Sequence, residues 1–545
     1  MSSPIVLGDE ALALGALHAG ITAAYGYPGT PSTEILEYLL ERADETGLVA
    51  QWCANEKTAY EEALGTSFAG CRVLVTMKHV GLNVAADPFM NSALLNLKGG
   101  LVVAVADDPS MHSSQNEQDS RFFADFAKIA CLEPTNQQEC YDMARAAFEI
   151  SEELHQPVMI RLVTRLSHSR ASITDKPPRS RNPAAKASDK QNWMLIPALA
   201  RRRWDHVLSI QPRLLALSEA SHWNPLCNVE SGAKAKVGYL CTGLGFNSFR
   251  ENWRDLADAE VPYLQIGQYP PPVDKIRRLA EAVETLVVLE EGYPFVERLV
   301  RGILPQAVTV RGKLDGSVPA SGELTPENVR PALGLPLHEC RSLGLASGLP
   351  EGSCDDSDDQ LPARPPQLCQ GCPHGDSYGA IKEALSAYPD GLVTADIGCY
   401  ALGVLPPYAV PETIICMGAS IGVAKGAWEA GYRHAVAVIG DSTFFHSGIT
   451  PLIDAISAKA GITVVILDNS TVGMTGGQDT ILPGSRIPAV AEALGVDPAH
   501  IRVLDALPKN RVENARILKE EIAWPGVSVV IAVRECLETL RKARK

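Results

Sequence analysis

Two segments near the end of the chain combine a buried-strand pattern with residues that suit a divalent cation. Val436–Ser442 and Ile462–Asn469 each consist of an apolar, β-branched run that ends in small and polar residues, as buried parallel strands do at a ligand-bearing edge. The segments lie about one strand–helix–strand unit apart, so Asp441 and Asn469 are expected at the carboxyl ends of two parallel strands, where open α/β sheets bind ligands. Their oxygen atoms, with a backbone carbonyl, suit Mg²⁺ held against a diphosphate. The structural alternative is a helix cap at Asp441 and a turn at Asn469.

The elements that must position these residues follow an alternation of helix and strand patterns. This alternation predicts an α/β fold of several domains with doubly wound parallel sheets. We expect an α/β domain over 1–172, a linker segment with a helix over 173–235, a smaller α/β domain over 236–345, a linker over 346–366 and a last α/β domain over 367–545. The linker over 173–235 is recognised by its basic, proline-containing composition, and the linker over 346–366 by its acidic residues.

Composition narrows the classes of function. The net charge is −15, which argues against nucleic acid or an anionic membrane surface as a partner. Neither a signal peptide nor an apolar run of membrane-spanning length is recognisable. A cytoplasmic protein is therefore expected, and disulfides are not the expected use of its 13 cysteines.

Polar loops follow several predicted strands of the first domain. The Tyr25–Glu34 loop contains Thr30, Glu56 opens a helix, and His79 follows the strand that ends near Lys78. A rigid turn and a favourable helix-dipole interaction are structural alternatives for the loop and for Glu56. His79, and His112 in the Asp107–Arg121 loop, are candidate acid–base groups or donors to a substrate carboxylate. Arg121 is a candidate for a bidentate carboxylate contact or for a surface ion pair.

Taken together, these segments resemble the alpha subunits of indolepyruvate:ferredoxin oxidoreductases, within the thiamine diphosphate (ThDP)-dependent 2-oxoacid:ferredoxin oxidoreductase superfamily. The resemblance covers essentially the whole chain and rests on motifs that are specific as a set. They are Tyr27–Ser32, Asn55–Lys57, Lys78–Asn83, Ser113–Asp119, Cys369–His374, Asp396–Tyr400, Met417–Ser420, Gly440–Ser442 with Asn469, and Gly473–Gln478.

The resemblance implies a pyrimidine-binding domain first, a transketolase-C-like domain in the middle and a diphosphate-binding domain last. It makes Glu56 the group that activates ThDP through its pyrimidine nitrogen, which requires a site that tunes its pKa. It makes Asp441, Asn469 and the carbonyl of Thr471 the ligands of Mg²⁺. His79 and His374 belong to the reacting end by the same resemblance. The other implied cofactor contacts are Thr30, Gly398, Gly418, Ser420, Gly440 and Ser442, with Gly418 and Ser420 donating N–H groups to the diphosphate from a helix start.

The implied reaction is oxidative decarboxylation of an aryl pyruvate to an acyl-CoA, with CoA as co-substrate and electrons passed to ferredoxin or another acceptor. A smaller beta subunit is implied as partner, in a dimer of heterodimers, and the cofactor is expected where the first and last domains meet. Two alternatives stay open. One is a non-oxidative decarboxylase that releases an aldehyde, and the other is a non-catalytic scaffold subunit with a ThDP fold.

The cysteines depart from the family pattern. Relatives usually end in a ferredoxin-like extension with two runs of cysteines, whereas Cys536 is the last cysteine of this sequence. In the superfamily, four cysteines arranged like Cys369, Cys372, Cys399 and Cys536 hold a [4Fe–4S] cluster. Zinc is an alternative for such a set. A further alternative is a cofactor-contacting turn at Cys369–Cys372 with the other two cysteines in the core.

Overall fold

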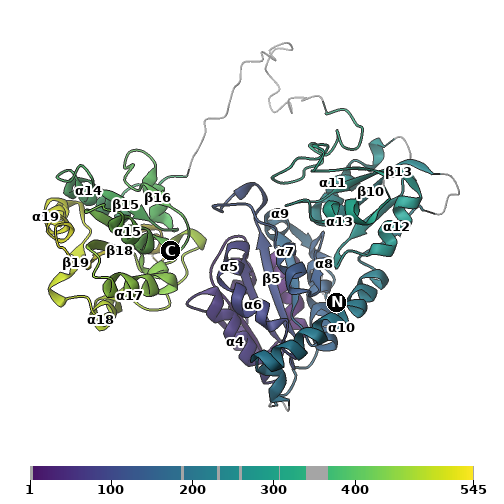
Figure 1. The fold of residues 1–545 in the computed structure, drawn as a ribbon, viewed down its shortest axis with the longest axis horizontal. Helices are drawn as coiled ribbons and strands as arrows, with labels where there is room; N and C mark the ends of the chain where they lie inside the picture. Colours follow the sequence, from purple (N-terminus) through teal and green to yellow (C-terminus); the bar gives the residue numbers. More distant parts are fainter. Residues whose placement is uncertain are drawn as a thin grey trace, which may run out of the picture. The chain divides into compact units, whose positions relative to one another are not determined.

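The computed structural model describes residues 4–185, 189–229, 234–256, 260–305, 307–338 and 366–543. The chain divides into two compact units, Met1–Cys340 and Arg341–Lys545 (Figure 1). The expected boundary at 345 and the expected linker over 346–366 fall outside the described residues, apart from residue 366. No helix in the described ranges is both long enough and apolar enough to cross a membrane.

The first unit is built around a large, mostly parallel sheet. Its spatial order is β12 (Gln268–Tyr269), β6 (Cys131–Leu132), β7 (Val158–Val163), β5 (Leu101–Asp107), β4 (Val73–Lys78), β2 (Ala23–Gly26) and β3 (Val49–Trp52). Only the β12–β6 pair is antiparallel among these strands. Alternate residues of the central strands enter two different cores, because successive side chains point to opposite faces. One core contains α1 (Gly8–His18), α2 (Thr33–Leu40) and α8 (Gln137–Leu154), and the other contains α4 (Glu56–Phe68) and α6 (Ala86–Ser92).

A second sheet belongs to the same unit. Its order is β14 (Thr309–Arg311), β13 (Val283–Leu289), β10 (Ala235–Thr242), β11 (Tyr263–Ile266) and β9 (Leu226–Cys227), with β9 antiparallel. One hydrophobic core runs from the first sheet into this one, and it includes Val103 as well as Leu240 and Ile276. The helix expected in the linker segment is α10 (Pro197–Ala220). That segment also supplies β9, which pairs with β11. The expected domain over 236–345 supplies β12 to the first sheet. Strand pairing therefore crosses the expected boundaries at 172 and 235.

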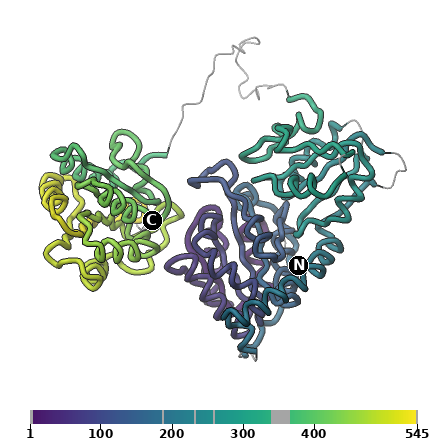
Figure 2. The backbone as a smooth tube through the Cα atoms, in the orientation of Figure 1, coloured from purple at the N-terminus to yellow at the C-terminus, as the bar shows by residue number. Residues whose placement is uncertain are grey.

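The second unit contains a parallel sheet with helices on both faces. Its order is β16 (Thr413–Ile414), β15 (Leu392–Ala395), β17 (Ala435–Gly440), β18 (Ile462–Asp468), β20 (Ser528–Val533) and β19 (Ile501–Asp505). Val436 and Val438 pack with α14 (Pro373–Leu385) and α19 (Arg511–Ile522). Ala437 and Ile439 pack with α15 (Ala419–Glu429), α17 (Ile449–Ser457) and α18 (Ile487–Leu494). Figure 2 traces this unit from green to yellow. The predicted doubly wound α/β class is thus confirmed.

Candidate functional site

Asp441 and Asn469 lie at the carboxyl edge of the sheet in the second unit. Register pairs Gly440 of β17 with Leu467 of β18, so Asp441 comes alongside Asp468 at the ends of the two strands. Both carboxylates are buried, and Asn469 and Thr471 are buried beside them. The N–H of Ser470 donates to Asp441 Oδ2 at 3.0 Å and to Asp468 Oδ1 at 3.1 Å. The strand ends therefore bring the expected metal ligands to one place.

Asp468 is a functional candidate that the sequence analysis missed. Burial, and then the negative charge of Asp468, raise the pKa of Asp441 to about 8. Two adjacent buried carboxylates are unfavourable unless protonated or neutralised by a cation. The donor set thus fits Mg²⁺, which prefers oxygen ligands. A signal was present in the sequence, because Asp468 directly precedes Asn469 at the end of a strand.

His374 and Asn469 contact each other next to this carboxylate pair. The Asn469 Nδ2 group donates to His374 Nε2 at 3.3 Å, which requires that this ring nitrogen carry no proton. Burial lowers the pKa of His374 to about 4, so the imidazole is neutral at physiological pH. Asn469 Oδ1 accepts the N–H of Thr471 at 3.3 Å and keeps a second lone pair for a further contact.

The ring of Tyr400 packs against Gly398 and Gly440, two glycines that are expected to contact the cofactor. A Cβ atom at Gly440 would lie 2.7 Å from Tyr400 Cε1, and one at Gly398 would lie 3.0 Å from Tyr400 Cδ1. The Tyr400 hydroxyl donates to the carbonyl of Ile397 at 3.1 Å. Gly398 and Gly440 therefore allow the ring to pack against the strand ends. Ser442 is half-buried immediately after Asp441.

Gly418 and Ser420, for which donation to a diphosphate is predicted, lie at a helix start beside the buried carboxylate of Asp396. Gly418 adopts φ +87° at the N-terminus of α15. The N–H of Ser420 donates to Asp396 Oδ1 at 2.9 Å, and its hydroxyl donates to Asp396 Oδ2 at 2.6 Å. Burial raises the pKa of Asp396 to about 6, although hydrogen bonds from Ser420, Ala419 and Gly418 oppose that shift. Ser420 is therefore engaged by an internal carboxylate at the helix start for which a diphosphate is predicted.

The four candidate cluster cysteines lie close together at the same edge. Burial, and then the thiols of Cys372, Cys536 and Cys369, raise the pKa of Cys399 to about 12. Burial also raises the pKa of Cys372, with further contributions from Cys369 and Cys536. Cys536 precedes α20 (Leu537–Ala543), and its N–H donates to the carbonyl of Asn469 at 3.2 Å. This bond places the backbone of Cys536 beside Asn469, one of the expected metal ligands.

The spacing of these thiols does not match a preformed zinc site. Thiolates on a tetrahedral Zn²⁺ lie about 3.8 Å apart, given a Zn–S distance of about 2.3 Å. Three or more side chains whose potential ligand atoms all lie within 4.8 Å of one another form a candidate metal site. In the described ranges, such a set consists of Asp9, Glu34 and His168 and includes none of these cysteines. The thiols are thus spread more widely than zinc requires.

Glu56 and the Thr30 loop lie at the carboxyl edge of the large sheet in the first unit. Glu56 is buried at the start of α4, directly after Asn55, whose side chain accepts the N–H of Thr58 at 2.8 Å. Gly81 in α5 (His79–Val84) approaches the Glu56 side chain so closely that a Cβ atom there would lie 2.7 Å from Glu56 Cγ. Gly81 is thus a positioning residue that sequence reasoning did not single out.

Hydrogen bonds connect the Thr30 loop to the segment that follows β5. The Ser113 hydroxyl donates to the carbonyl of Thr30 at 3.2 Å, and Lys78 Nζ donates to the carbonyl of Ser113 at 2.7 Å. Burial lowers the pKa of Lys78 to about 8, with Asp108 opposing. This edge therefore combines a buried ammonium group with hydroxyl groups.

His79 is fully buried and presents one ring nitrogen without a partner. Its Nε2 lies 3.2 Å from the carbonyl of Asn116 and 3.3 Å from Asn116 Oδ1, so Nε2 carries the proton. Its Nδ1 is buried and has no hydrogen-bond partner in the described part of the chain. His79 can therefore accept a hydrogen bond from a bound molecule.

His112 and Arg121 do not face this edge as free groups. His112 Nε2 lies 3.4 Å from Glu323 Oε1. Arg121 is buried, and its guanidinium binds Asp119 and lies 3.2 Å from Glu290 Oε2. Arg121 therefore makes the expected bidentate carboxylate contact, with the internal partner Asp119, whereas the alternative of a surface ion pair is wrong.

Family models cover much of both units. Residues 14–200 match the family described as pyruvate flavodoxin/ferredoxin oxidoreductase, thiamine diP-binding, and residues 396–531 match the thiamine pyrophosphate enzyme, C-terminal TPP binding domain.

Several curated proteins are similar over nearly the whole chain. The indolepyruvate oxidoreductase subunit IorA of Pyrococcus abyssi is 36% identical over 99% of this chain and 87% of its own length. The IorA subunit of Methanothermobacter thermautotrophicus is 36% identical over 98% of this chain and 86% of its own length. The 2-oxoglutarate synthase subunit KorA of the latter organism is 30% identical over 31% of this chain and 46% of its own length. Among solved structures, the 2-oxoglutarate:ferredoxin oxidoreductase of Magnetococcus marinus aligns with a TM-score of 0.48 and 16% identity, over 60% of this chain and 64% of that chain.

Proposed function

Because the chain belongs to the family of indolepyruvate oxidoreductase IorA subunits, we propose that it catalyses the oxidative decarboxylation of an aryl pyruvate such as indolepyruvate. The product is the corresponding arylacetyl-CoA, with CoA as co-substrate, and the electrons pass to ferredoxin or another acceptor. The observation that carries this proposal is the pair of buried carboxylates Asp441 and Asp468 beside Asn469, a donor set that suits the metal of a diphosphate cofactor.

In the second unit we assign Mg²⁺ to Asp441, Asn469 and the carbonyl of Thr471. Asp468 adds negative charge beside Asp441 and so favours a cation there. His374 holds the Asn469 amide through the 3.3 Å contact and fixes which way that amide points. Thiamine diphosphate, when bound, supplies the electron-sink chemistry by which a 2-oxoacid loses CO₂.

In the first unit we assign Glu56 to the pyrimidine end of the cofactor and Thr30 to its surroundings. Glu56 is buried, and Gly81 leaves room for its side chain, so the carboxyl group can exchange a proton without solvent competing for it. His79 offers Nδ1 as an acceptor, because Nε2 donates to Asn116. Gly398, Gly440 and Ser442 remain proposed cofactor contacts, whereas Gly418 and Ser420 serve the Asp396 contact.

The proposal extends to partners and to electron exit. The relatives are named as subunits, and we propose a smaller beta subunit as partner, in a dimer of heterodimers located in the cytoplasm. We assign a [4Fe–4S] cluster to Cys369, Cys372, Cys399 and Cys536, which are gathered at the edge that carries Asp441. Four thiolates are the ligand set of such a cluster.

The test is an anaerobic assay of the chain co-purified with its small subunit. With ThDP, Mg²⁺, CoA and indolepyruvate, we expect reduction of a viologen dye and formation of the acyl-CoA. Glu56→Gln should lower turnover by at least about 10²-fold. Glu61→Gln is the matched control, because Glu61 is an exposed glutamate of the same helix that pairs with Lys57. Iron analysis of the same preparation should give about four irons per chain.

Three results would contradict parts of the proposal. Aldehyde without dye reduction would mean a non-oxidative decarboxylase. Unchanged turnover in Glu56→Gln would mean that the chain is a scaffold whose partner carries the chemistry. Dye reduction by a preparation without iron would remove the cluster while leaving the reaction in place.

A further inference from the structure

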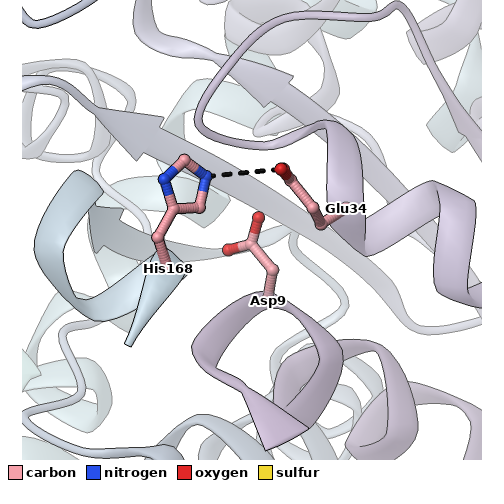
Figure 3. Close-up of side chains that lie close together, drawn as sticks. All are labelled: Asp9, Glu34 and His168. Atoms are coloured by element: carbon pink, nitrogen blue, oxygen red, sulfur yellow. Dashed lines mark ion pairs between the residues drawn. The ribbon is translucent and has the colours of Figure 1, made fainter. Parts of the chain in front are cut away.

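Asp9, Glu34 and His168 form a candidate metal site in the first unit, which none of the assignments above uses. We propose that these three side chains bind a divalent transition-metal ion that ties together the starts of α1 and α2 and the end of α9 (Thr164–His168). One ligand atom from each residue lies within 4.8 Å of those of the other two. In Figure 3 the Asp9 carboxylate points into the space between the His168 ring and the Glu34 carboxylate. Three elements distant in sequence thus converge on one point.

The buried carboxylate of Asp9 is the feature that indicates a bound cation. Asp9 is completely buried, and neither of its oxygen atoms has a hydrogen-bond partner in the described part of the chain. Burial raises the pKa of Asp9 well above its ordinary value, and the nearby Ser167 hydroxyl, which itself lacks a hydrogen bond of ordinary geometry, only opposes that shift. An ionised carboxylate in this position is costly unless a cation compensates it.

The remaining contacts of the cluster leave donor atoms for a metal ion. His168 Nε2 lies 3.5 Å from Glu34 Oε1, and the other oxygen atom of Glu34 is buried without a partner among the described residues. The His168 side chain is 36% exposed, so an ion can enter from solvent. Glu10 adds a further negative charge close to Asp9.

The donor set indicates the class of ion. Mg²⁺ and Ca²⁺ prefer oxygen atoms alone, whereas an imidazole nitrogen suits first-row transition ions and carboxylates suit Mn²⁺. A site with two carboxylates and one imidazole therefore selects a divalent transition ion over Mg²⁺. Such an ion stabilises the start of α2, which directly follows the loop that contains Thr30.

Mn²⁺ is the appropriate probe, because the thiols of this chain favour softer ions such as Zn²⁺. Metal-free protein, supplied with excess Mg²⁺ and ThDP, is titrated with Mn²⁺, and free Mn²⁺ is measured by electron paramagnetic resonance. The wild type should bind one Mn²⁺ per chain more than Asp9→Asn and His168→Gln. Pulsed measurements should show a nitrogen coupling to the bound Mn²⁺ that His168→Gln loses.

Glu37→Gln is the matched control, since it removes the same charge from a partly exposed position on α2, and it should keep the extra ion. Circular dichroism establishes that each variant is folded, so loss of binding is not loss of structure. Equal Mn²⁺ binding by the wild type and Asp9→Asn would overturn the proposal and would mean that Asp9 is buried as the neutral acid. A bound ion without nitrogen coupling in the wild type would overturn the assignment of His168.

Discussion

Gly81 shows how the absence of one side chain positions another. A Cβ atom at Gly81 would lie 2.7 Å from Glu56 Cγ and 2.8 Å from Glu56 Cδ, so Gly81→Ala must displace the carboxyl group. We expect turnover at saturating ThDP to fall about 10²-fold, the effect of misplacing a reacting group by roughly 1 Å. The melting temperature should not fall in parallel, because alanine favours a helix over glycine by about 1 kcal/mol.

Gly65→Ala is the control for this variant. Gly65 lies on the exposed side of α4, and a Cβ atom there would meet nothing within 4 Å. It should therefore keep full turnover while gaining up to about 1 kcal/mol of stability. Wild-type turnover in Gly81→Ala would show that the close approach of Gly81 does not position Glu56.

At the scale of single residues, the sequence predicted where candidate residues lie in the fold better than it predicted which groups they contact. Asp441 and Asn469 were predictable, because each lies among the polar residues that follow an apolar run and so identify the end of a buried strand. The neighbour Asp468 was missed, since its importance depends on the register between β17 and β18. A carboxylate contact or a surface ion pair was expected for Arg121, but its burial beside Glu290, 3.2 Å away, could not be predicted, because Glu290 lies in a distant segment.

At the scale of elements, the start of α15 gives a prediction that separates two roles for Ser420. Its hydroxyl donates to the buried Asp396 carboxylate at 2.6 Å. Ser420→Ala should therefore lower the free energy of unfolding by about 2 kcal/mol, the contribution of a hydrogen bond to a charged group. The affinity for ThDP should change less than twofold. Urea unfolding and ThDP titration measure the two quantities.

Ser457→Ala, at an exposed helical position of the same unit, is the control and should change neither quantity. A tenfold loss of ThDP affinity in Ser420→Ala without a loss of stability would restore the diphosphate contact that the sequence predicted.

The long strands and helices were predictable for a physical reason. Strands such as β5 and β18 are buried on both faces, so their sequences are continuous apolar runs. The two-residue strands β9 and β12 carry no such signal. Each is itself an edge strand, held by antiparallel pairing with one neighbour, β11 or β6. That pairing depends on how the chain returns to the sheet and not on local composition.

At the scale of the whole molecule, a buried charge network joins the two sheets of the first unit. Arg161 on β7 contacts Asp107 at 2.6 Å and also binds Glu133. Glu290 and Glu291 follow β13 of the second sheet, and Glu290 lies beside Arg121. Burial raises the pKa of both Glu290 and Glu291 to about 7. The composition and periodicity of the sequence do not reveal which charged residues pair inside a core or how burial shifts their pKa values.

This network makes the stability of the first unit depend on pH in a defined direction. The pKa of Glu291 is about 7 in the folded protein, against the ordinary value of 4.5. At a pH between these two values, the folded protein keeps a proton on Glu291 that the unfolded chain has released. The free energy of unfolding therefore decreases as pH rises through this window, by about 2 kcal/mol between pH 5 and pH 8 for this one group.

Glu291→Gln removes the titration but can still accept the N–H of Leu324, which Glu291 now accepts at 2.7 Å. Urea unfolding followed by tryptophan fluorescence should show a pH dependence reduced by that amount, whereas Glu284→Gln, at an exposed position of β13, should leave it unchanged. A pH dependence equal to that of the wild type in Glu291→Gln would mean that Glu291 is ionised in the folded protein and that the surrounding cations compensate it.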